Sequence, residues 1–169
     1  MSDVLDVKPH IENPDLGIDD RKRLADALAT IVADTYVLLV KTQGYHWNVV
    51  GPLFISLHKL TEEQYEDLFE AGDELAERIR TLGYPAPCSL HAMINDSRLA
   101  EAKGNPTAEQ MVENLVADHE TVVRHLREIT ELAEELHDQG TADMLTDRMK
   151  SHEKAIWMLS AIVARSSTA

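Results

Sequence analysis

Hydrophobic positions recur at intervals of three and four residues over long stretches of the chain, a pattern that predicts amphipathic helices. The first predicted helix runs from an N-cap at Asp19 or Asp20 to about Trp47, and the second from about Pro52 to Leu82. The apolar positions that define these two helices are Leu24, Leu28, Ile31, Leu38, Leu57, Leu60, Leu68, Leu75 and Ile79. Both helices are therefore expected to bury one face.

The second half of the chain predicts two more long helices. One begins at Thr107, where Thr107 and Gln110 fit a capping box, and Gly140 is expected to end it. Thr141 is expected to cap the last helix, which runs to about Val163. Two histidines, His119 and His152, fall within the apolar stripes of these helices. The stripes consist of Leu115, His119, Val122, Leu126, Ile129, Ala133 and Leu136 in the first helix, and Leu145, Met149, His152, Ile156 and Leu159 in the second.

The segment that joins the second and third long helices contains proline, cysteine, serine and asparagine, and can hold only a short helix, about Leu90–Asn95. The segment is long enough to cross a bundle from end to end. The predicted fold is therefore all-α, a ferritin-like four-helix bundle with a short extra helix in the long link. Residues 1–18 are predicted to form an extended N-terminal arm, and residues 19–169 the bundle domain.

Composition narrows the classes of protein to which the chain can belong. Its 169 residues suit one domain, and 7 glycines with 6 prolines are too few for the turns of an all-β protein. Sixteen basic and 30 acidic residues give a formal charge of −14. This charge argues against binding to DNA or to anionic membranes, because Lys and Arg supply the affinity for phosphate.

The same sequence bears on cellular location. The single cysteine, Cys88, cannot form an intrachain disulfide, so a reducing cytoplasm is expected. The first 20 residues are acidic and carry no apolar run, so no signal peptide is expected. A membrane span needs about 18 apolar residues in succession, and no such stretch occurs.

One face of the second predicted helix is rich in carboxylates. At about 100° per residue, with His58 at zero, Glu62, Asp73, Glu66 and Glu77 all fall within about 100° of one another. Two interpretations stay open at this point. The face is either a solvated acidic surface or a binding surface for Fe(II), Mn(II) or Zn(II), which carboxylate and imidazole ligands suit.

Spacing constrains the metal interpretation. His58 and Asp73 are 15 residues apart, about 22 Å along a helix, so one chain cannot close both on one ion. Asp73 and Glu77, at i and i+4, can share an ion. If His46 and His58 belong to the same site as this acidic pair, a second subunit must supply the other half, as a two-fold pair would.

Several runs of the sequence resemble the Dps family (DNA-binding protein from starved cells), also called mini-ferritins. The runs are His-Trp-Asn-Val-Val-Gly-Pro-Leu-Phe at 46–54, His58 twelve residues after His46, and Asp-Glu-Leu-Ala-Glu-Arg at 73–78. The resemblance implies a dodecamer that forms a hollow shell, with ferroxidase centres at two-fold interfaces. By this resemblance, the catalytic residues are His46, His58, Asp73, Glu77 and Trp47. The implied metal ligands are His46 and His58 of one subunit with Asp73 and Glu77 of its neighbour, and Glu62 is a supporting ligand.

The resemblance further implies oxidation of Fe(II) to Fe(III), preferably by hydrogen peroxide, and storage of ferric mineral that protects against oxidative stress. Iron is thus the expected metal, with Zn(II) or Mn(II) as competitors. Glu63 and Glu66 are expected to nucleate mineral. An acidic three-fold pore is expected from Glu134, Asp138, Asp143 and Asp147, with helix-capping acids as the alternative.

The remaining histidines and aromatic residues favour structural roles. His119 and His152 are expected to be hydrogen-bonded core residues, with a contact near the metal site as the alternative. Surface positions are expected for His10, His91, His125 and His137, and a core position for Trp157. Cys88 is expected to be packed or incidental rather than nucleophilic.

Binding to DNA is predicted to be weak or absent, although members of the resembled family bind DNA through lysine-rich ends. The arm carries one lysine, Lys8, and the C-terminal tail one arginine, Arg165. The alternative function is a DNA-compacting nucleoid protein with secondary iron chemistry, and the missing lysines count against it. A third interpretation is a helical interaction module whose acidic face is merely solvated.

Overall fold

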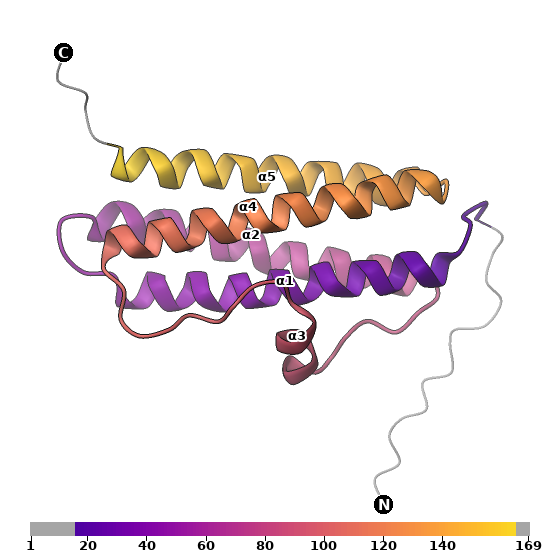
Figure 1. Ribbon diagram of the computed structural model, residues 1–169, viewed down its shortest axis with the longest axis horizontal. Coiled ribbons are helices and arrows are strands. Elements are labelled where there is room, and N and C mark those ends of the chain that lie inside the picture. The colour runs from indigo at the N-terminus through magenta and orange to yellow at the C-terminus, as the bar shows by residue number, and fades with distance from the viewer. Residues whose placement is uncertain (1–15, 165–169) are drawn as a thin grey trace, which may run out of the picture.

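The computed structural model describes residues 16–164, which form five α-helices and, within that range, no strand (Figure 1). The helices are α1 (Arg21–Asn48), α2 (Phe54–Thr81), α3 (Leu90–Asp96), α4 (Ala108–Glu135) and α5 (Gln139–Val163). Pairs α1–α2 and α4–α5 each pack closely as antiparallel hairpins. The predicted all-α four-helix bundle with a short extra helix is confirmed. The predicted arm lies outside the described residues except for its last three positions.

The link between α2 and α4 determines the topology of the bundle. Helices α2 and α4 run in the same direction, so the chain returns along the whole bundle before α4 begins (Figure 1). On the way it forms α3, which packs against α1. The end-to-end crossing predicted from the length of the link is therefore confirmed.

The core follows the predicted apolar stripes closely. The largest side chains with less than 2% exposure are Leu24, Leu28, Ile31, Leu38, Leu57, Leu68, Leu75, Ile79, Leu82, Leu115, Leu126 and Leu145. Each contributes about 2–3 kcal/mol by leaving water. Threonines within the same stripes are also satisfied, because Thr35 and Thr42 donate their hydroxyls to carbonyls one turn earlier, at 2.8 Å.

A buried carboxylate fastens the link to the bundle. Asp34 of α1 is fully buried, and it accepts hydrogen bonds from the Ser97 hydroxyl and the Arg98 backbone N–H, each at 2.7 Å. Its other oxygen is 2.7 Å from Nδ1 of His125 in α4. The prediction that His125 lies at the surface is wrong, since its ring is 3% exposed and bound to this carboxylate.

The corner between α4 and α5 differs from the prediction. Gly140 does not end the third long helix and Thr141 does not cap the fourth, because α5 already begins at Gln139. The chain reverses at His137, whose φ of 62° lies in the left-handed region. The N-cap is Asp138, whose side chain accepts the backbone N–H of Thr141.

Asp138 is also bound by an arginine from another helix. Both of its carboxylate oxygens lie 2.7 Å from the Arg78 guanidinium of α2, and the residue is 2% exposed. Burial by itself raises the pKa of Asp138, but hydrogen bonds from Arg78 and Thr141 outweigh it and hold the pKa below its ordinary value. A carboxylate neutralised inside the subunit is not available to line a pore, so for Asp138 the helix-capping alternative holds.

Two further side chains lie at the surface of the single chain. Trp157, predicted to be in the core, is 68% exposed, so that prediction is wrong for the subunit by itself. Cys88 is exposed and has no disulfide partner. No helix in the described range is long and apolar enough to cross a membrane.

We expect Asp138→Ala to lower the free energy of unfolding by about 2–4 kcal/mol, because α5 loses its cap and Arg78 loses its partner. Urea unfolding followed by circular dichroism measures the change. Asp143→Ala, an exposed acid in the next turn of α5, is the matched control and should cost less than about 0.5 kcal/mol. Equal midpoints for the two variants would show that the Asp138 cap is unimportant.

Candidate metal centre

Two imidazoles meet where α1 ends and α2 begins. His46 lies in the last turn of α1, and His58 near the start of α2. Nδ1 of His46 is 2.8 Å from the carbonyl oxygen of His58, and Nδ1 of His58 is 2.9 Å from the carbonyl oxygen of His46. The rings stack with centroids 3.8 Å apart and planes inclined by 15°.

These reciprocal bonds determine which nitrogen of each ring can bind a metal. A carbonyl oxygen only accepts, so Nδ1 carries the proton in both His46 and His58. In the neutral rings, Nε2 then keeps its lone pair, as in the histidine ligands of many metal sites. The predicted pair is therefore brought together in one subunit, with two nitrogen ligands oriented by the backbone.

Aromatic side chains enclose the two rings. Phe54 stacks on His58 at 5.0 Å, and Tyr65 meets His46 edge-on at 5.2 Å. Partial burial, followed by the charges of Glu62 and Glu66, raises the pKa of Tyr65, so its phenol stays protonated at neutral pH. The sequence interpretation missed Tyr65, although its position seven residues after His58 places it on the same helical face.

The predicted acidic ligands divide into two groups. Glu62 is half-buried one turn after His58, whereas Asp73 and Glu77 are exposed much further along α2. The helical rise keeps Asp73 about 22 Å from His58. In the described part of the chain, no three His, Cys, Asp or Glu side chains come together as metal ligands. One chain thus carries an imidazole pair where α1 meets α2, and an acidic pair further along α2.

Comparisons with known proteins identify the family of the chain. The Ferritin-like domain family matches residues 25–168. An uncharacterized low temperature-induced protein of Nostoc sp. is 47% identical over 153 residues, which covers 88% of this chain and 85% of that protein. Dps from Thermosynechococcus elongatus superposes with a TM-score of 0.84 at 32% identity, covering 86% of this chain and 93% of that chain. The chain belongs to the Dps family of ferritin-like proteins.

A second similar structure comes from a protein that is described as a diiron-carboxylate protein. The Dps protein of Vibrio cholerae, described as a member of a broad superfamily of ferritin-like diiron-carboxylate proteins, superposes with a TM-score of 0.81. The two sequences are 35% identical, and the match covers 85% of this chain and 91% of the other. The predicted membership in the Dps family is thus confirmed.

The other predicted functional acids of this Dps-family chain are mostly exposed. Glu63 and Glu66 lie on α2, and Glu134 and Asp143 flank the α4–α5 corner. Asp147 forms a surface ion pair with Lys150 at 2.7 Å. Exposure leaves these carboxylates free to face a cavity or a pore. The nucleation and pore roles remain predictions, now without Asp138.

The two histidines of the apolar stripes form a second pair, inside the bundle. His119 of α4 and His152 of α5 are 2% and 3% exposed, and their Nδ1 atoms are 2.7 Å apart. The expectation of hydrogen-bonded core histidines is confirmed. Burial, and then the charge of Arg148, lowers the pKa of His119 to about 4. Burial also lowers the pKa of His152, well below its ordinary value.

This neutral pair predicts a loss of stability in mild acid. Below the ordinary pKa of 6.5, the unfolded chain binds protons at these positions, whereas folded His119 binds one only near pH 4. His119 alone should therefore lower the free energy of unfolding by about 2 kcal/mol between pH 7 and pH 5. Urea midpoints measured at several pH values test this expectation.

The double variant His119→Leu/His152→Leu should lose less stability over that range than the wild type. His91→Ala, which removes an exposed imidazole of α3, is the control and should keep the wild-type pH dependence. The same pH dependence in all three proteins would contradict a neutral buried pair.

Proposed function

We propose that the assembled protein is a ferroxidase that oxidises Fe(II) to Fe(III), preferably with hydrogen peroxide, at sites shared between two subunits. Each site takes His46, His58 and Glu62 from one subunit, and Asp73 and Glu77 from a two-fold neighbour. The ferric product collects inside a hollow dodecameric shell, which protects the cell from iron and peroxide. Membership in the Dps family and the diiron-carboxylate description of the Vibrio cholerae relative support iron as the substrate.

One observation carries the proposal. Hydrogen bonds to the backbone hold the rings of His46 and His58 so that each presents one lone pair. Of the proposed carboxylate ligands, only Glu62 lies within one turn of His58 on α2. The exposed acidic pair Asp73 and Glu77 has the i, i+4 spacing of a shared ligand pair but no imidazole beside it. Two subunits related by a two-fold axis would bring each half beside its complement and create two equivalent sites.

The chemistry follows from the types of ligand. Carboxylate oxygens stabilise Fe(III) more than Fe(II), so Asp73 and Glu77 favour loss of an electron from bound iron. Two Fe(II) ions held close together supply two electrons to one peroxide molecule. The O–O bond breaks and, with two protons, two water molecules form, so no hydroxyl radical is released. Trp47, which follows His46 in the sequence and is 66% exposed, intercepts a radical that escapes in this proposal.

The remaining acids serve supply and storage in this proposal. Glu63 and Glu66 nucleate the mineral, and Glu134, Asp143 and Asp147 line the pore that admits Fe(II). A ring of carboxylates concentrates cations at such an entrance. Zn(II) and Mn(II) suit the same ligands and compete with iron for the shared site.

A complementation experiment tests whether the site is shared. His58→Ala removes an imidazole, Asp73→Ala removes an acid, and each variant alone should lose fast Fe(II) oxidation. When the two variants are co-expressed and assemble at random, half of the two-fold pairs contain one of each. Each mixed pair has one intact site, so about a quarter of the wild-type activity should return.

Ferric absorbance after anaerobic loading with Fe(II) and addition of peroxide is the readout. Size-exclusion chromatography should show that both variants keep the size of the wild-type assembly. Glu120→Ala, which removes an exposed acid of α4, is the control and should keep full activity. No recovery in the mixed protein would mean that each site lies within one chain, and no oxidation by the wild type would refute the ferroxidase proposal itself.

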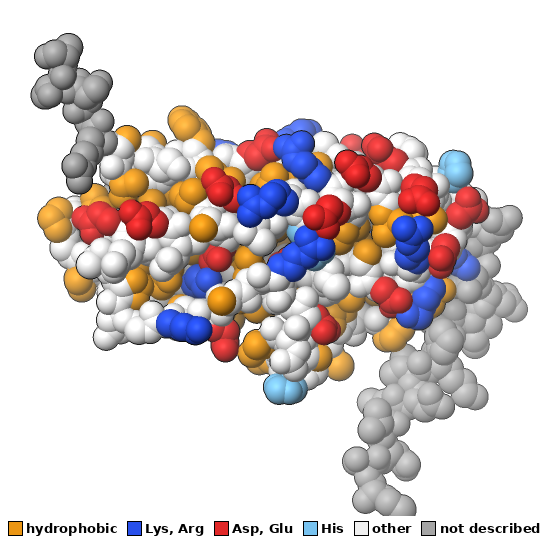
Figure 2. Space-filling model, viewed as in Figure 1, with side chains coloured by type: hydrophobic (Ala, Val, Ile, Leu, Met, Phe, Trp, Pro, Cys, Tyr) orange, Lys and Arg blue, Asp and Glu red, His pale blue; other side chains and the backbone are white. Residues whose placement is uncertain are grey.

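Binding to DNA should remain weak. The net charge is −14 per chain, and on the face in view Lys and Arg side chains alternate with Asp and Glu instead of forming a basic surface (Figure 2). We expect no retardation of plasmid in a gel at about 0.1 M salt, where phosphate contacts would still hold a basic protein. Tight retardation would favour the DNA-compacting alternative.

A further inference from the structure

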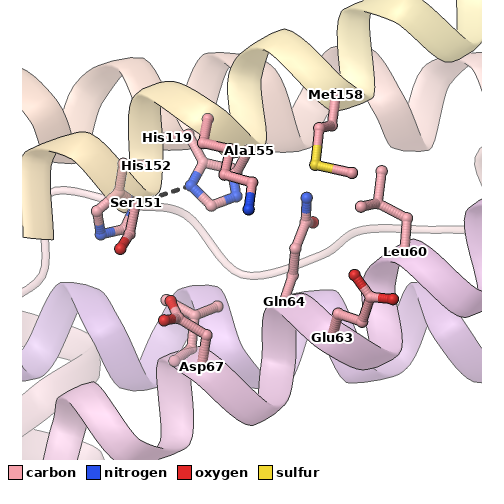
Figure 3. Close-up of a pocket in the computed structure, with 11 residues that line it drawn as sticks. Leu60, Glu63, Gln64, Asp67, His119, Ser151, His152, Ala155 and Met158 are labelled. Carbon is pink, nitrogen blue, oxygen red and sulfur yellow. Dashed lines mark hydrogen bonds between the residues drawn. The ribbon is translucent and has the colours of Figure 1, made fainter.

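A polar cavity lies between α2, α4 and α5, and exposed residues such as Glu63 and Lys154 line its edge. It has a volume of about 160 Å³ and is lined by residues of α2, α4 and α5. Figure 3 shows the Gln64 amide, the His119 ring and the Met158 sulfur directed toward the same space, one from each of these helices. All of these side chains belong to one subunit.

The cavity contains buried polar atoms without partners. Both amide atoms of Gln64 and Nε2 of His119 make no hydrogen bond, and no other buried side-chain nitrogen or oxygen in the described range lacks one. Gln64 is 8% exposed and His119 is 2% exposed. A buried polar atom left without a partner costs about 1–3 kcal/mol, so three such atoms facing one cavity indicate that water or a ligand occupies it.

The residues around the cavity point to a metal ion rather than an anion. Imidazole nitrogen, amide oxygen and thioether sulfur are neutral ligands that suit first-row transition metals, and Glu63 at the cavity edge adds a carboxylate. Asp67 is already bound by Arg148 at 2.6 and 3.0 Å, so its charge is balanced. An oxyanion would face the Glu63 carboxylate in a chain of net charge −14. Lys154 also lines the cavity, and it is an exposed residue.

The second histidine orients the first. When Nδ1–H of His119 donates to Nδ1 of His152, across 2.7 Å, Nε2 of His119 keeps a lone pair directed away from His152. Burial keeps His119 neutral at physiological pH, as a metal ligand must be. His152 then acts like the acceptor behind a metal-binding histidine, which holds the ring and its tautomer.

We infer that the bundle of each subunit binds one divalent transition-metal ion, held by Nε2 of His119, Oε1 of Gln64, the Glu63 carboxylate and the Met158 thioether, with water completing the shell. The cavity has room for the ion and about four water molecules, at about 30 Å³ each. This intrasubunit site goes beyond the proposed ferroxidase centre, because it needs no neighbouring subunit and shares no residue with that centre.

Diffraction from crystals of the wild-type protein soaked with Co(II) tests the site directly. We expect an anomalous difference peak between His119 and Gln64 in every subunit, in addition to any peak at a subunit interface. A cavity that holds only water, with no anomalous peak at a Co(II) concentration that fills the other sites, would overturn the inference.

A titration in solution gives an independent measurement. In the background variant His58→Ala/Asp73→Ala, which lacks one proposed ferroxidase ligand from each half of the shared site, we expect one equivalent of Co(II) per subunit with visible d–d absorption. Adding His119→Leu should remove this equivalent, and adding Gln64→Leu should weaken binding by about tenfold or more. His137→Ala, in place of His119→Leu, is the control and should bind as the background does.

The two proposals fail in distinguishable ways. If the equivalent of Co(II) bound by the background variant is unchanged by His119→Leu, the cavity is not its binding site, whether or not the wild type oxidises iron. A wild-type protein that shows the anomalous peak in the cavity but does not oxidise Fe(II) would count against the ferroxidase proposal alone. If His119→Leu fails to fold, the Gln64→Leu titration and the anomalous peak still decide the matter.

Discussion

The reciprocal hydrogen bonds between His46 and His58 are the interaction on which the candidate centre depends. Each ring bonds to the backbone of the opposite helix, so neither can rotate without losing that hydrogen bond. Gly51, with φ of 92°, lets the chain reverse in the short connection that brings the helices to this spacing. The backbone therefore fixes the tautomer, the direction and the spacing of both rings before any metal arrives, which is the preorganisation that a tight site requires.

A second constraint comes from the stiffness of α2. Because the helix rises by about 1.5 Å per residue, Asp73 cannot approach His58 unless α2 breaks. Yet α2 buries Leu57, Leu68 and Leu75 along its length, and breaking it would expose that face. The core that stabilises the subunit is thus the same feature that prevents the subunit from closing its own site. Under the proposed function, folding is a property of the single chain and catalysis a property of the assembly.

Much of the fold could be predicted because helical periodicity is local. The stripes of all four long helices were recognisable, and the Thr107 capping box is present, since both depend on residues a few positions apart. The N-cap of α5 was wrongly predicted to be Thr141. The true cap, Asp138, is held partly by a hydrogen bond from Arg78, which lies 60 residues away in the sequence. His125 was misjudged for the same reason, because only the folded bundle brings Asp34 to it.

The candidate site shows the same division between local and distant information. The spacing along α2 was enough to predict that one chain cannot bring His58 and Asp73 to the same ion. The burial of Gln64 could not be predicted, since a glutamine among glutamates is typical of a solvated face. The prediction for Trp157 was wrong for a different reason. An apolar residue on a helix indicates burial, but the pattern does not say whether the same chain or another chain covers the side chain. The period of each helix was therefore predictable, whereas the side-chain partners of His125 and Asp138, which come from other helices, were not.

The two histidine pairs show how hydrogen-bond partners decide what an imidazole can do. At the α1–α2 corner, both rings donate to carbonyls, so His46 and His58 each offer Nε2 as a ligand. Inside the bundle, His119 and His152 share one contact between Nδ1 atoms, and only the ring that donates keeps a lone pair on Nε2. The first pair therefore supplies two nitrogen ligands and the second supplies one. A metal in the bundle must complete its shell with weaker neutral ligands, and the unpartnered amide of Gln64 is the group positioned to provide one.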